Sequence, residues 1–190
     1  MTAKEIIELS AEFLGLDELL ATNVFVTTGT APTSEQLKEV NTLIRCLNLV
    51  LDEIATEFFP ITKNKNIQFV NGEKLINEID VNMLEIISLQ NNDGTKIRFR
   101  ADADKIYANT ETANVNYRSR PISILELTNN CDQFGLKLTK RIFAYGVAME
   151  FSFINSLTDD ATIWENRFKN SLLTQVRKNS EKQLPQRRWL

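Results

Sequence analysis

The hydrophobic positions of this chain are most regular between residues 33 and 60. Apolar side chains recur there at spacings of three and four, which is the spacing of one face of an α-helix. These side chains are Leu37, Val40, Ile44, Leu47, Leu51, Ile54 and Phe58. Thr33 and Gln36 have the spacing of an N-terminal capping box, and Pro60 cannot continue a helix. The pattern predicts a long helix over residues 34–59 with one face in a core.

Helical spacing also occurs near both ends of the chain. Thr2 and Glu5 predict a capped amphipathic helix that ends at Gly15, a residue type that accepts the left-handed conformation of a helix end. Residues 136–178 predict a helical hairpin with a turn at residues 156–160. Its first helix is apolar on most sides, so we expect it to be central in the fold. The acidic residues of the turn suit the positive end of the second helix, which explains them without a metal site.

After Pro60, the spacing of apolar residues changes from the helical period of 3.6 residues to the strand period of 2. Short apolar groups bounded by turn residues predict strands, and the turn residues at 91–94 predict a hairpin. A basic row alternates with apolar residues at the next strand and consists of Lys96, Arg98 and Arg100. This row is either a solvated strand face, which is the commoner case, or a nucleic-acid stripe. Residues 61–127 are therefore predicted to form a small antiparallel β unit.

Together the patterns predict an α+β protein that is mainly α. We expect a single domain over residues 1–190, whose helical bundle is formed by residues 1–60 and 132–180. The β unit at residues 61–127 is inserted into this bundle, and residues 181–190 form an extended C-terminal tail. A chain of 190 residues that is 43% hydrophobic can bury a sizeable core, so a disordered or fibrous class is excluded.

The residue types exclude several kinds of site. Histidine is absent, which removes Ser-His-Asp and Cys-His nucleophilic sites and the commonest zinc ligand. No glycine-rich phosphate loop occurs, and no two cysteines are spaced to bind a metal. An enzyme that uses only carboxylates or lysine is still open, although no motif points to one. We therefore predict that the protein is not an enzyme and has no catalytic residue, no cofactor and no metal.

Cysteine content and hydropathy bear on the compartment. Cys46 and Cys131 are too few for a disulfide framework, which favours a reducing environment. Cys46 is interpreted as a small core residue, and a bridge between the two cysteines is the less expected option. No apolar run approaches about 20 residues, so no membrane contact is predicted. The N-terminus also lacks the basic and apolar regions of a secretory signal.

Charge is distributed unevenly along the chain. Residues 1–60 contain ten acidic and three basic residues, a net charge of −7. From Ile163 onward there are seven basic and two acidic residues, a net charge of +5. A subunit that is acidic at one end and basic at the other can dock head-to-tail onto copies of itself. The alternative, given equal weight, is that solvated helix faces differ in charge by chance.

The last residues do not continue the helical pattern. They are Leu184, Pro185, Gln186, Arg187, Arg188, Trp189 and Leu190. Trp and Arg are over-represented among residues that carry interface energy. Most chain ends fray, but this composition favours a docking tail over a frayed end.

Four strings of the sequence carry a resemblance to a known family. They are LIRCLNLVLDEIATEFFP at 43–60, VNYRSRP at 115–121, RIFAYGVAMEF at 141–151 and WENRF at 164–168. With the order of the elements around them, they resemble the head–tail connector (adaptor) ring proteins of tailed bacteriophages. That group includes podovirus tail tubular protein A, and the sequence is similar above all to connector-like proteins of phages and prophages of Gram-positive bacteria. The resemblance runs over nearly the whole chain, but it rests on layout and loose strings and not on an invariant motif.

The resemblance implies a structural virion protein at the head–tail interface, assembled in the host cytoplasm. It implies a homo-oligomeric ring, usually a dodecamer, that joins the portal protein to the tail proteins. DNA passes through the lumen of such a ring without sequence-specific binding. Carried onto this chain, the C-terminal segment becomes a peg that binds the portal, with Trp189 as its main anchor. The peg residues are Leu184, Pro185, Arg187, Arg188, Trp189 and Leu190.

Two other functions are kept as alternatives. A tail terminator or tail-completion protein also forms rings, but it would bind the tail tube and not the portal. A nucleic-acid-binding protein could use the basic C-terminal helix and tail, although a pI of 5.2 and the acids Glu165 and Glu181 argue against it.

Overall fold

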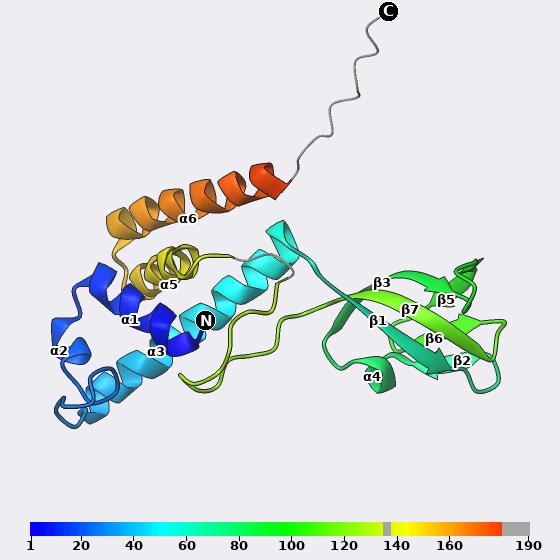
Figure 1. Ribbon diagram of the computed structural model, residues 1–190, viewed down its shortest axis with the longest axis horizontal. Coiled ribbons are helices and arrows are strands. Elements are labelled where there is room, and N and C mark those ends of the chain that lie inside the picture. The colour runs from blue at the N-terminus through cyan, green and yellow to red at the C-terminus, as the bar shows by residue number, and fades with distance from the viewer. Residues whose placement is uncertain (135–137, 180–190) are drawn as a thin grey trace, which may run out of the picture. The chain divides into compact units, whose positions relative to one another are not determined.

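The computed structural model describes residues 1–134 and 138–179, and the chain divides into two compact units (Figure 1). Among the described residues, the helical unit comprises Met1–Val50, Ile124–Asp132 and residues 138–179. The β unit comprises Leu51–Ser123 and residues 133–134. Because 46% of the chain is helix and 24% is strand, the predicted α+β class is confirmed, but the description as mainly α is confirmed only in part. The single-domain description stays a prediction, and the predicted tail at 181–190 lies outside the described residues.

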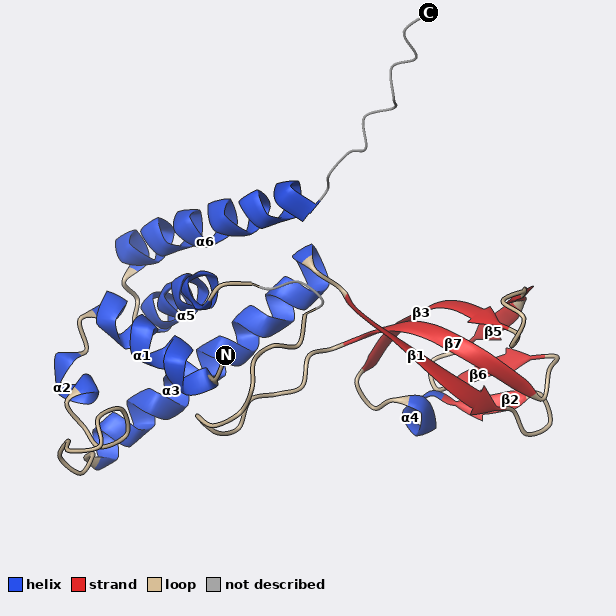
Figure 2. Ribbon diagram, in the orientation of Figure 1, coloured by secondary structure: helices blue, strands red, loops and turns tan. Residues whose placement is uncertain are grey.

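The helices of the helical unit follow the predicted order (Figure 2). They are α1 (Ala3–Leu14), α2 (Asp17–Leu20), most of α3 (Ser34–Glu53), α5 (Lys140–Ile154) and α6 (Thr158–Asn179). The predicted hairpin is confirmed as α5 and α6, which pack on one another, and α1 packs on α5. The short helix α2 directly follows the end of α1.

Side chains close the helix ends as the sequence predicts. In the capping box of α1, the Glu5 N–H donates to Thr2 Oγ1 at 3.4 Å and the Thr2 N–H donates to Glu5 Oε2 at 2.9 Å. Thr33 and Gln36 make the same reciprocal pair at 3.2 and 2.8 Å before α3. Gly15 ends α1 with φ 68°, the left-handed conformation that an L side chain disfavours.

The long helix α3 buries most of its predicted apolar face. Val40, Ile44, Leu47, Leu51 and Ile54 are buried. Leu37 is 46% exposed, so its predicted burial is wrong; it lies in the first turn, where neighbouring residues are exposed as well. The helix runs directly into the π-helical turn η1 (Ile54–Phe58), where the Phe59 N–H donates to the Ile54 carbonyl at 2.7 Å. Pro60, which has no N–H, then ends it, as predicted.

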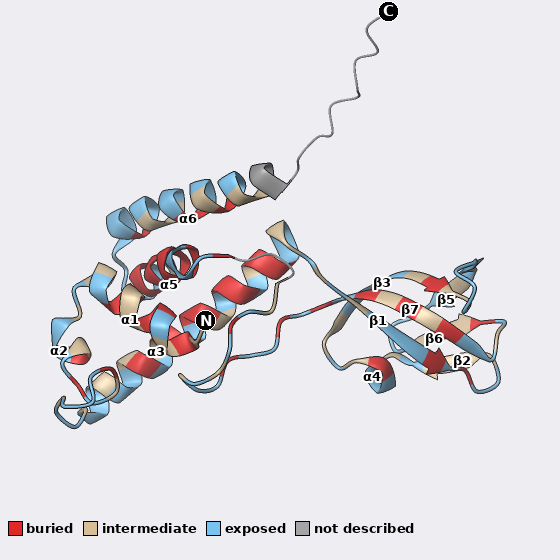
Figure 3. Ribbon diagram, viewed as in Figure 1, coloured by how far each residue is buried: buried red, intermediate tan, exposed pale blue. Residues whose placement is uncertain are grey.

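The predicted central position of the 140–154 helix is confirmed. Every residue of α5 from Ile142 to Met149 is buried, and Figure 3 shows buried positions all around this helix. Its neighbours approach closely at Gly146, where a Cβ atom would lie 2.7 Å from Val50 Cγ1 and 3.0 Å from Phe168 Cε2. Glycine therefore lets α5 pack tightly between α3 and α6. Cys46 and Cys131 are both buried and free, in agreement with the unbridged interpretation.

The β unit consists of two antiparallel sheets. Its elements after η1 are β1 (Ile61–Gln68), β2 (Glu73–Leu75), α4 (Ile76–Ile79), β3 (Met83–Gln90), β4 (Lys96–Ile97), β5 (Phe99–Ala101), β6 (Lys105–Ala108) and β7 (Thr112–Ser119). The strand orders are β1-β7-β3-β4 in one sheet and β2-β6-β5 in the other. Their apolar faces form one core, made of Ile67, Phe69, Ile79, Leu89, Ile106, Ala108, Ala113, Val115 and Tyr117. The predicted hairpin turn at 91–94 is confirmed, with Gly94 at φ 85° and the Asn91 N–H bound to the Thr95 carbonyl at 2.9 Å.

Two details of the strand prediction are wrong. The single strand expected over residues 95–100 is divided, because β4 pairs with β3 whereas β5 pairs with β6 in the other sheet. Strand structure was also expected up to residue 127, but the last strand in the described part of the chain ends at Ser119. After Pro121, asparagine side chains form hydrogen bonds with the backbone that a neighbouring strand would otherwise form. The Ile124 N–H and carbonyl bind Asn48 at 2.7 and 2.8 Å.

Candidate interaction surfaces

Three aromatic rings from three helices stack on one another in the helical unit. They are Phe13 at the end of α1, Tyr145 in α5 and Trp164 in α6. The ring centroids are 5.2 to 5.8 Å apart, and the ring planes differ by 13° to 26°. Tyr145 is buried, whereas Phe13 and Trp164 are half-buried, so the edge of the stack reaches the surface.

Two arginines cover this stack. The Arg167 guanidinium lies 4.9 Å from the Trp164 ring and 6.0 Å from the Tyr145 ring. The Arg141 guanidinium lies 5.4 Å from the Tyr145 ring, and its Nε–H donates to the Tyr145 hydroxyl at 2.5 Å. Both arginines are exposed, and neither has an ion pair among the described residues. We call Phe13, Tyr145, Trp164, Arg141 and Arg167 the arginine–aromatic cluster.

A hollow between α5 and α6 adjoins this cluster. Its volume is about 210 Å³, and Arg141 and Tyr145 line it with polar residues of α6 such as Ser171, Thr174 and Gln175. Flat aromatic rings with cations held above them lose little conformational freedom on binding, and Trp, Tyr and Arg are the residues that dominate interface energies. The cluster therefore has the chemistry of a binding surface for anionic groups.

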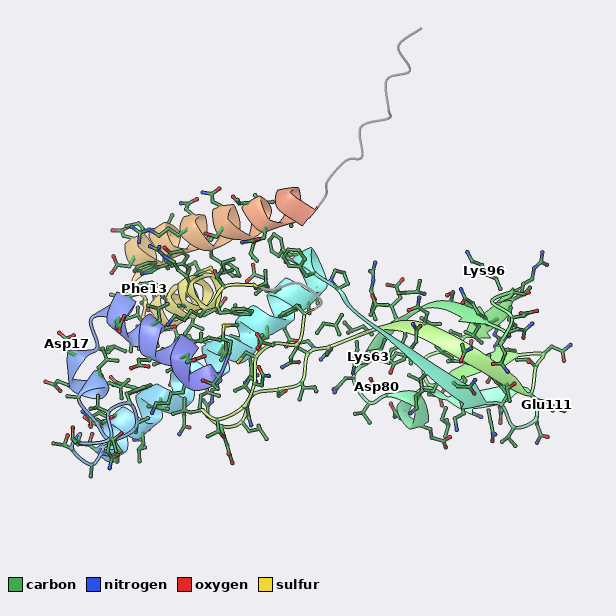
Figure 4. All side chains as sticks on the ribbon, in the orientation of Figure 1. Phe13, Asp17, Lys63, Asp80, Lys96 and Glu111 are labelled. Carbon is green, nitrogen blue, oxygen red and sulfur yellow. The ribbon has the colours of Figure 1, made fainter. Side chains whose placement is uncertain are left out.

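An acidic hollow lies where α2 approaches the start of α3. Its volume is about 560 Å³, and it is lined by Gly15, Leu16, Asp17, Glu18, Leu19, Thr33, Glu35, Gln36 and Glu39. Gln36 holds its two walls together, because its Nε2 donates to the Glu18 carbonyl at 3.2 Å. The four carboxylates have no ion pair within the described residues. Figure 4 labels Asp17 in this region.

The β unit contains a half-buried ionic network around Asp80 (Figure 4). Asp80 Oδ2 accepts from Lys63 Nζ at 3.0 Å and from the Tyr117 hydroxyl at 3.1 Å, while Oδ1 accepts from the Asn82 N–H at 2.8 Å. Burial by itself would raise the pKa of the Asp80 carboxyl, but these hydrogen bonds outweigh it and lower that pKa. Burial, together with the hydrogen bond to Asp80, raises the pKa of Tyr117 to about 12.

This network holds charges in place and does not poise a proton for transfer. A general acid or base works best with a pKa near the operating pH, whereas both pKa values here are moved away from neutrality. Asp80 instead ties the end of α4 to β1 and β7. Hydrophobic periodicity does not indicate this role of Asp80, and the one local signal is its position two residues before Asn82, a turn spacing.

An apolar groove runs along β3 and β5. Its volume is about 350 Å³, and its lining includes Ile76, Met83, Leu84, Ile86 and Phe99. Beside it, β3 pairs with β4 only at its last two residues, and its register against β7 shifts between 83 and 85 and between 86 and 88. The acids at the rim are already paired, Glu85 with Arg118 at 3.1 Å and Asp102 with Arg100 at 2.8 Å.

The sequence-predicted sites have different outcomes. The peg residues Leu184, Pro185, Arg187, Arg188, Trp189 and Leu190 lie outside the described residues. In the basic row, Lys96 and Arg98 are exposed, whereas Arg100 is paired with Asp102 and lies 5.3 Å from the Tyr107 ring. The partial pairing of this row favours the solvated-face interpretation.

Two properties of the described residues bear on metals and membranes. Over residues 1–134 and 138–179, Cys, Asp and Glu side chains form no group of three or more that could hold a metal ion. None of the helices in these ranges combines the length and the apolar character that crossing a bilayer requires.

Sequence reasoning missed the arginine–aromatic cluster as a unit. Each aromatic ring sits on a helix stripe that the pattern identified, but the pattern treats helices singly. Only the packing of α1, α5 and α6 brings the three rings together. The spacing of Arg141 and Tyr145, four residues apart, was the one available signal.

Comparison with known proteins adds no family assignment. No family model matches the sequence, and no curated protein matches it. The candidate surfaces are consequently interpreted from their own geometry and charge.

Proposed function

We propose that this protein is a subunit of a head–tail connector ring of a tailed bacteriophage. In this proposal, identical copies form a ring between the portal and the tail, and DNA passes through its lumen. The helical unit is a helical bundle that builds the wall of the ring, and the C-terminal segment is the portal peg. The protein acts at the head–tail interface of the virion and is not an enzyme.

The observation that carries the proposal is the order of elements. A long helix precedes an antiparallel β unit, which is followed by a tight helical hairpin and then by the C-terminal segment. The connector-like strings fall on defined places in this order. Residues 43–60 cover the second half of α3 and all of η1, residues 115–121 overlap β7, and residues 141–151 lie in α5.

The surfaces of the helical unit add support. A ring of identical subunits needs complementary patches on each copy. The described residues include a patch of exposed arginines on aromatic rings and a hollow whose carboxylates make no ion pair with other described residues. The presence of both patches supports head-to-tail docking as the reason for the uneven charge of the sequence, over chance variation between helix faces.

The test is capture of the purified protein by the portal protein and by the tail-tube protein of the same genome. Three forms are compared: the full chain, a chain stopped after Gln183, and full-length Trp189→Ala. We expect the full chain to bind the portal, the truncated chain to lose binding, and Trp189→Ala to weaken it by about tenfold or more, as for an interface hot spot. Circular dichroism of each form controls for folding.

Other outcomes decide against parts of the proposal. Capture by the tail tube alone would move the protein to the tail terminator class. Portal capture that survives truncation would exclude the peg but keep the connector. Salt-sensitive binding to DNA fragments with no capture by either protein would favour the nucleic-acid-binding alternative.

A further inference from the structure

We infer that the arginine–aromatic cluster of one copy docks into the acidic hollow of a second copy of this chain. The inference rests on the proposed function, because it names the contact by which copies would meet in the ring. It concerns only the helical unit, which contributes both surfaces.

The cluster is organised before any partner arrives. Arg141 is held by its hydrogen bond to the Tyr145 hydroxyl, and Arg167 lies across the Trp164 ring. Fixing a long arginine side chain at an interface normally costs conformational entropy, and part of that cost is already met here. The guanidinium groups keep N–H donors for a partner, since each has five and Arg141 uses one in the contact with Tyr145.

The acidic hollow is the complementary surface. Asp17, Glu18 and Glu35 are exposed and Glu39 is half-buried, and none has an ion pair in the described part of the chain. The half-buried Leu16 shares the lining, so the hollow offers an apolar contact beside its carboxylates. Carboxylates accept paired hydrogen bonds from arginine, which fixes orientation as well as strength.

A second copy is the occupant that the charges favour. The acidic surplus of residues 1–60 includes the four carboxylates of the hollow, and the basic surplus beyond residue 162 includes Arg167 of the cluster, although Arg141 precedes it. The folded surface of one chain therefore carries both the guanidinium groups of the cluster and the carboxylates of the hollow. When arginines of one copy occupy the hollow of the next, that copy's own arginines remain available, so the contact can repeat.

The test uses two charge-reversed variants and their mixture. Variant one is Arg141→Glu with Arg167→Glu. Variant two reverses all four carboxylates of the hollow and is Asp17→Lys, Glu18→Lys, Glu35→Lys and Glu39→Lys. Each alone puts like charges on both surfaces, whereas the mixture restores opposite charges at every contact. A matched control, Lys96→Glu with Arg98→Glu, makes the same change of charge as variant one, but in the β unit.

Association is measured by sedimentation velocity at low ionic strength and by native mass spectrometry of copies bound to the portal. We expect each variant alone to associate at least about tenfold more weakly than the unmodified chain, as reversal of close interface charges predicts. The mixture should recover that loss, and the control should show none. Recovery also proves that both variants are folded.

The inference is overturned if the mixture associates no better than its components in both assays. Its failure is distinguishable from failure of the proposed function. Assembly of variant one on the portal at the unmodified level would remove the inference and leave the connector in place. Recovery by the mixture in solution without portal capture of any form would remove the connector and leave the contact.

Discussion

At the scale of single residues, the described part of the helical unit contains one buried side-chain hydroxyl without a hydrogen-bond partner. Ser152 is fully buried in α5, and its Oγ has no hydrogen-bond partner among the described residues. A polar atom buried without a partner costs about 1–3 kcal/mol. We therefore expect Ser152→Ala to raise the free energy of unfolding by about 1 kcal/mol.

Urea unfolding of both proteins measures this change. Thr162→Ala is the matched control, because its hydroxyl is exposed and binds the Thr158 carbonyl at 2.9 Å. It should shift stability by less than about 0.5 kcal/mol. A loss of stability in Ser152→Ala would mean that this hydroxyl is bound in solution.

Also at the residue scale, the Asp80 network makes stability depend on pH at both extremes. The pKa of Asp80 is lower in the folded chain than its ordinary 3.8, so its stabilisation is complete above that value and is lost as the pH falls through the folded value. The pKa of Tyr117 is raised from 10.0 to about 12, so its contribution is complete below pH 10 and is lost as the pH rises toward 12.

Two substitutions test this dependence. Asp80→Asn should lower the free energy of unfolding by about 1–3 kcal/mol at neutral pH, and the difference should shrink below about pH 4. In a spectrophotometric titration, Tyr117→Phe should remove the tyrosine that ionises last. If Tyr117 instead titrates near pH 10, its hydroxyl does not bind Asp80 in solution.

At the scale of elements, two glycines stabilise helices for different physical reasons. Gly15 has φ 68° at the end of α1, and a Cβ there would meet no atom within 4 Å. Gly146 lies inside α5, where a Cβ would meet Val50 and Phe168 at 2.7 and 3.0 Å. We expect Gly15→Ala to cost about 1 kcal/mol from backbone strain alone.

Gly146→Ala should cost about 1–3 kcal/mol through overpacking, reduced by the better helix propensity of alanine. A double mutant distinguishes overpacking at Gly146 from backbone strain at Gly15. Val50→Ala removes the methyl groups that the new Cβ would meet, so Gly146→Ala should cost less in that background. No such rescue is expected for Gly15→Ala. Chemical denaturation of the four variants measures the coupling, and simple additivity at Gly146 would contradict the close approach.

The elements that the sequence predicted well are those with a period and an end signal. Neighbouring residues alone determine such elements. Examples are the apolar stripe of α3, the capping boxes at Thr2 and Thr33, and the turn at Gly94. The division between β4 and β5 could not be predicted in this way. Ile97 and Phe99 alternate as in one strand, and only pairing with β3 on one side and β6 on the other separates them.

The candidate site was less predictable than the fold, for the same reason. The predicted helical hairpin over residues 136–178 contains Tyr145 and Trp164, but their stacking with Phe13 depends on the distances between helices. The charge surplus of residues 1–60 was visible in the sequence, whereas its concentration around Glu18 and Glu35 needs the approach of α2 to α3. Patterns along a chain identify faces, and tertiary packing decides which faces meet.

At the scale of the whole molecule, each compact unit has a buried core of its own. Leu89 is fully buried in the core of the β unit, and Phe168 is fully buried in the helical unit beside Gly146. Separate cores allow separate cooperative transitions. We expect Leu89→Ala to destabilise the β unit by about 2–5 kcal/mol and Phe168→Ala to destabilise the helical unit by about 3–5 kcal/mol.

Native-state hydrogen exchange distinguishes the two units, because protection is measured for each amide. Leu89→Ala should lower protection in β3 and β7 while α5 keeps its protection, and Phe168→Ala should do the reverse. Leu173→Ala is a matched control, since Leu173 is 44% exposed on α6 and should change neither. Equal loss in both units from either substitution would mean that the chain unfolds as one cooperative body. Independent units would also mean that substitutions in the β unit leave the arginine–aromatic cluster intact, so the Lys96 and Arg98 control isolates charge from stability.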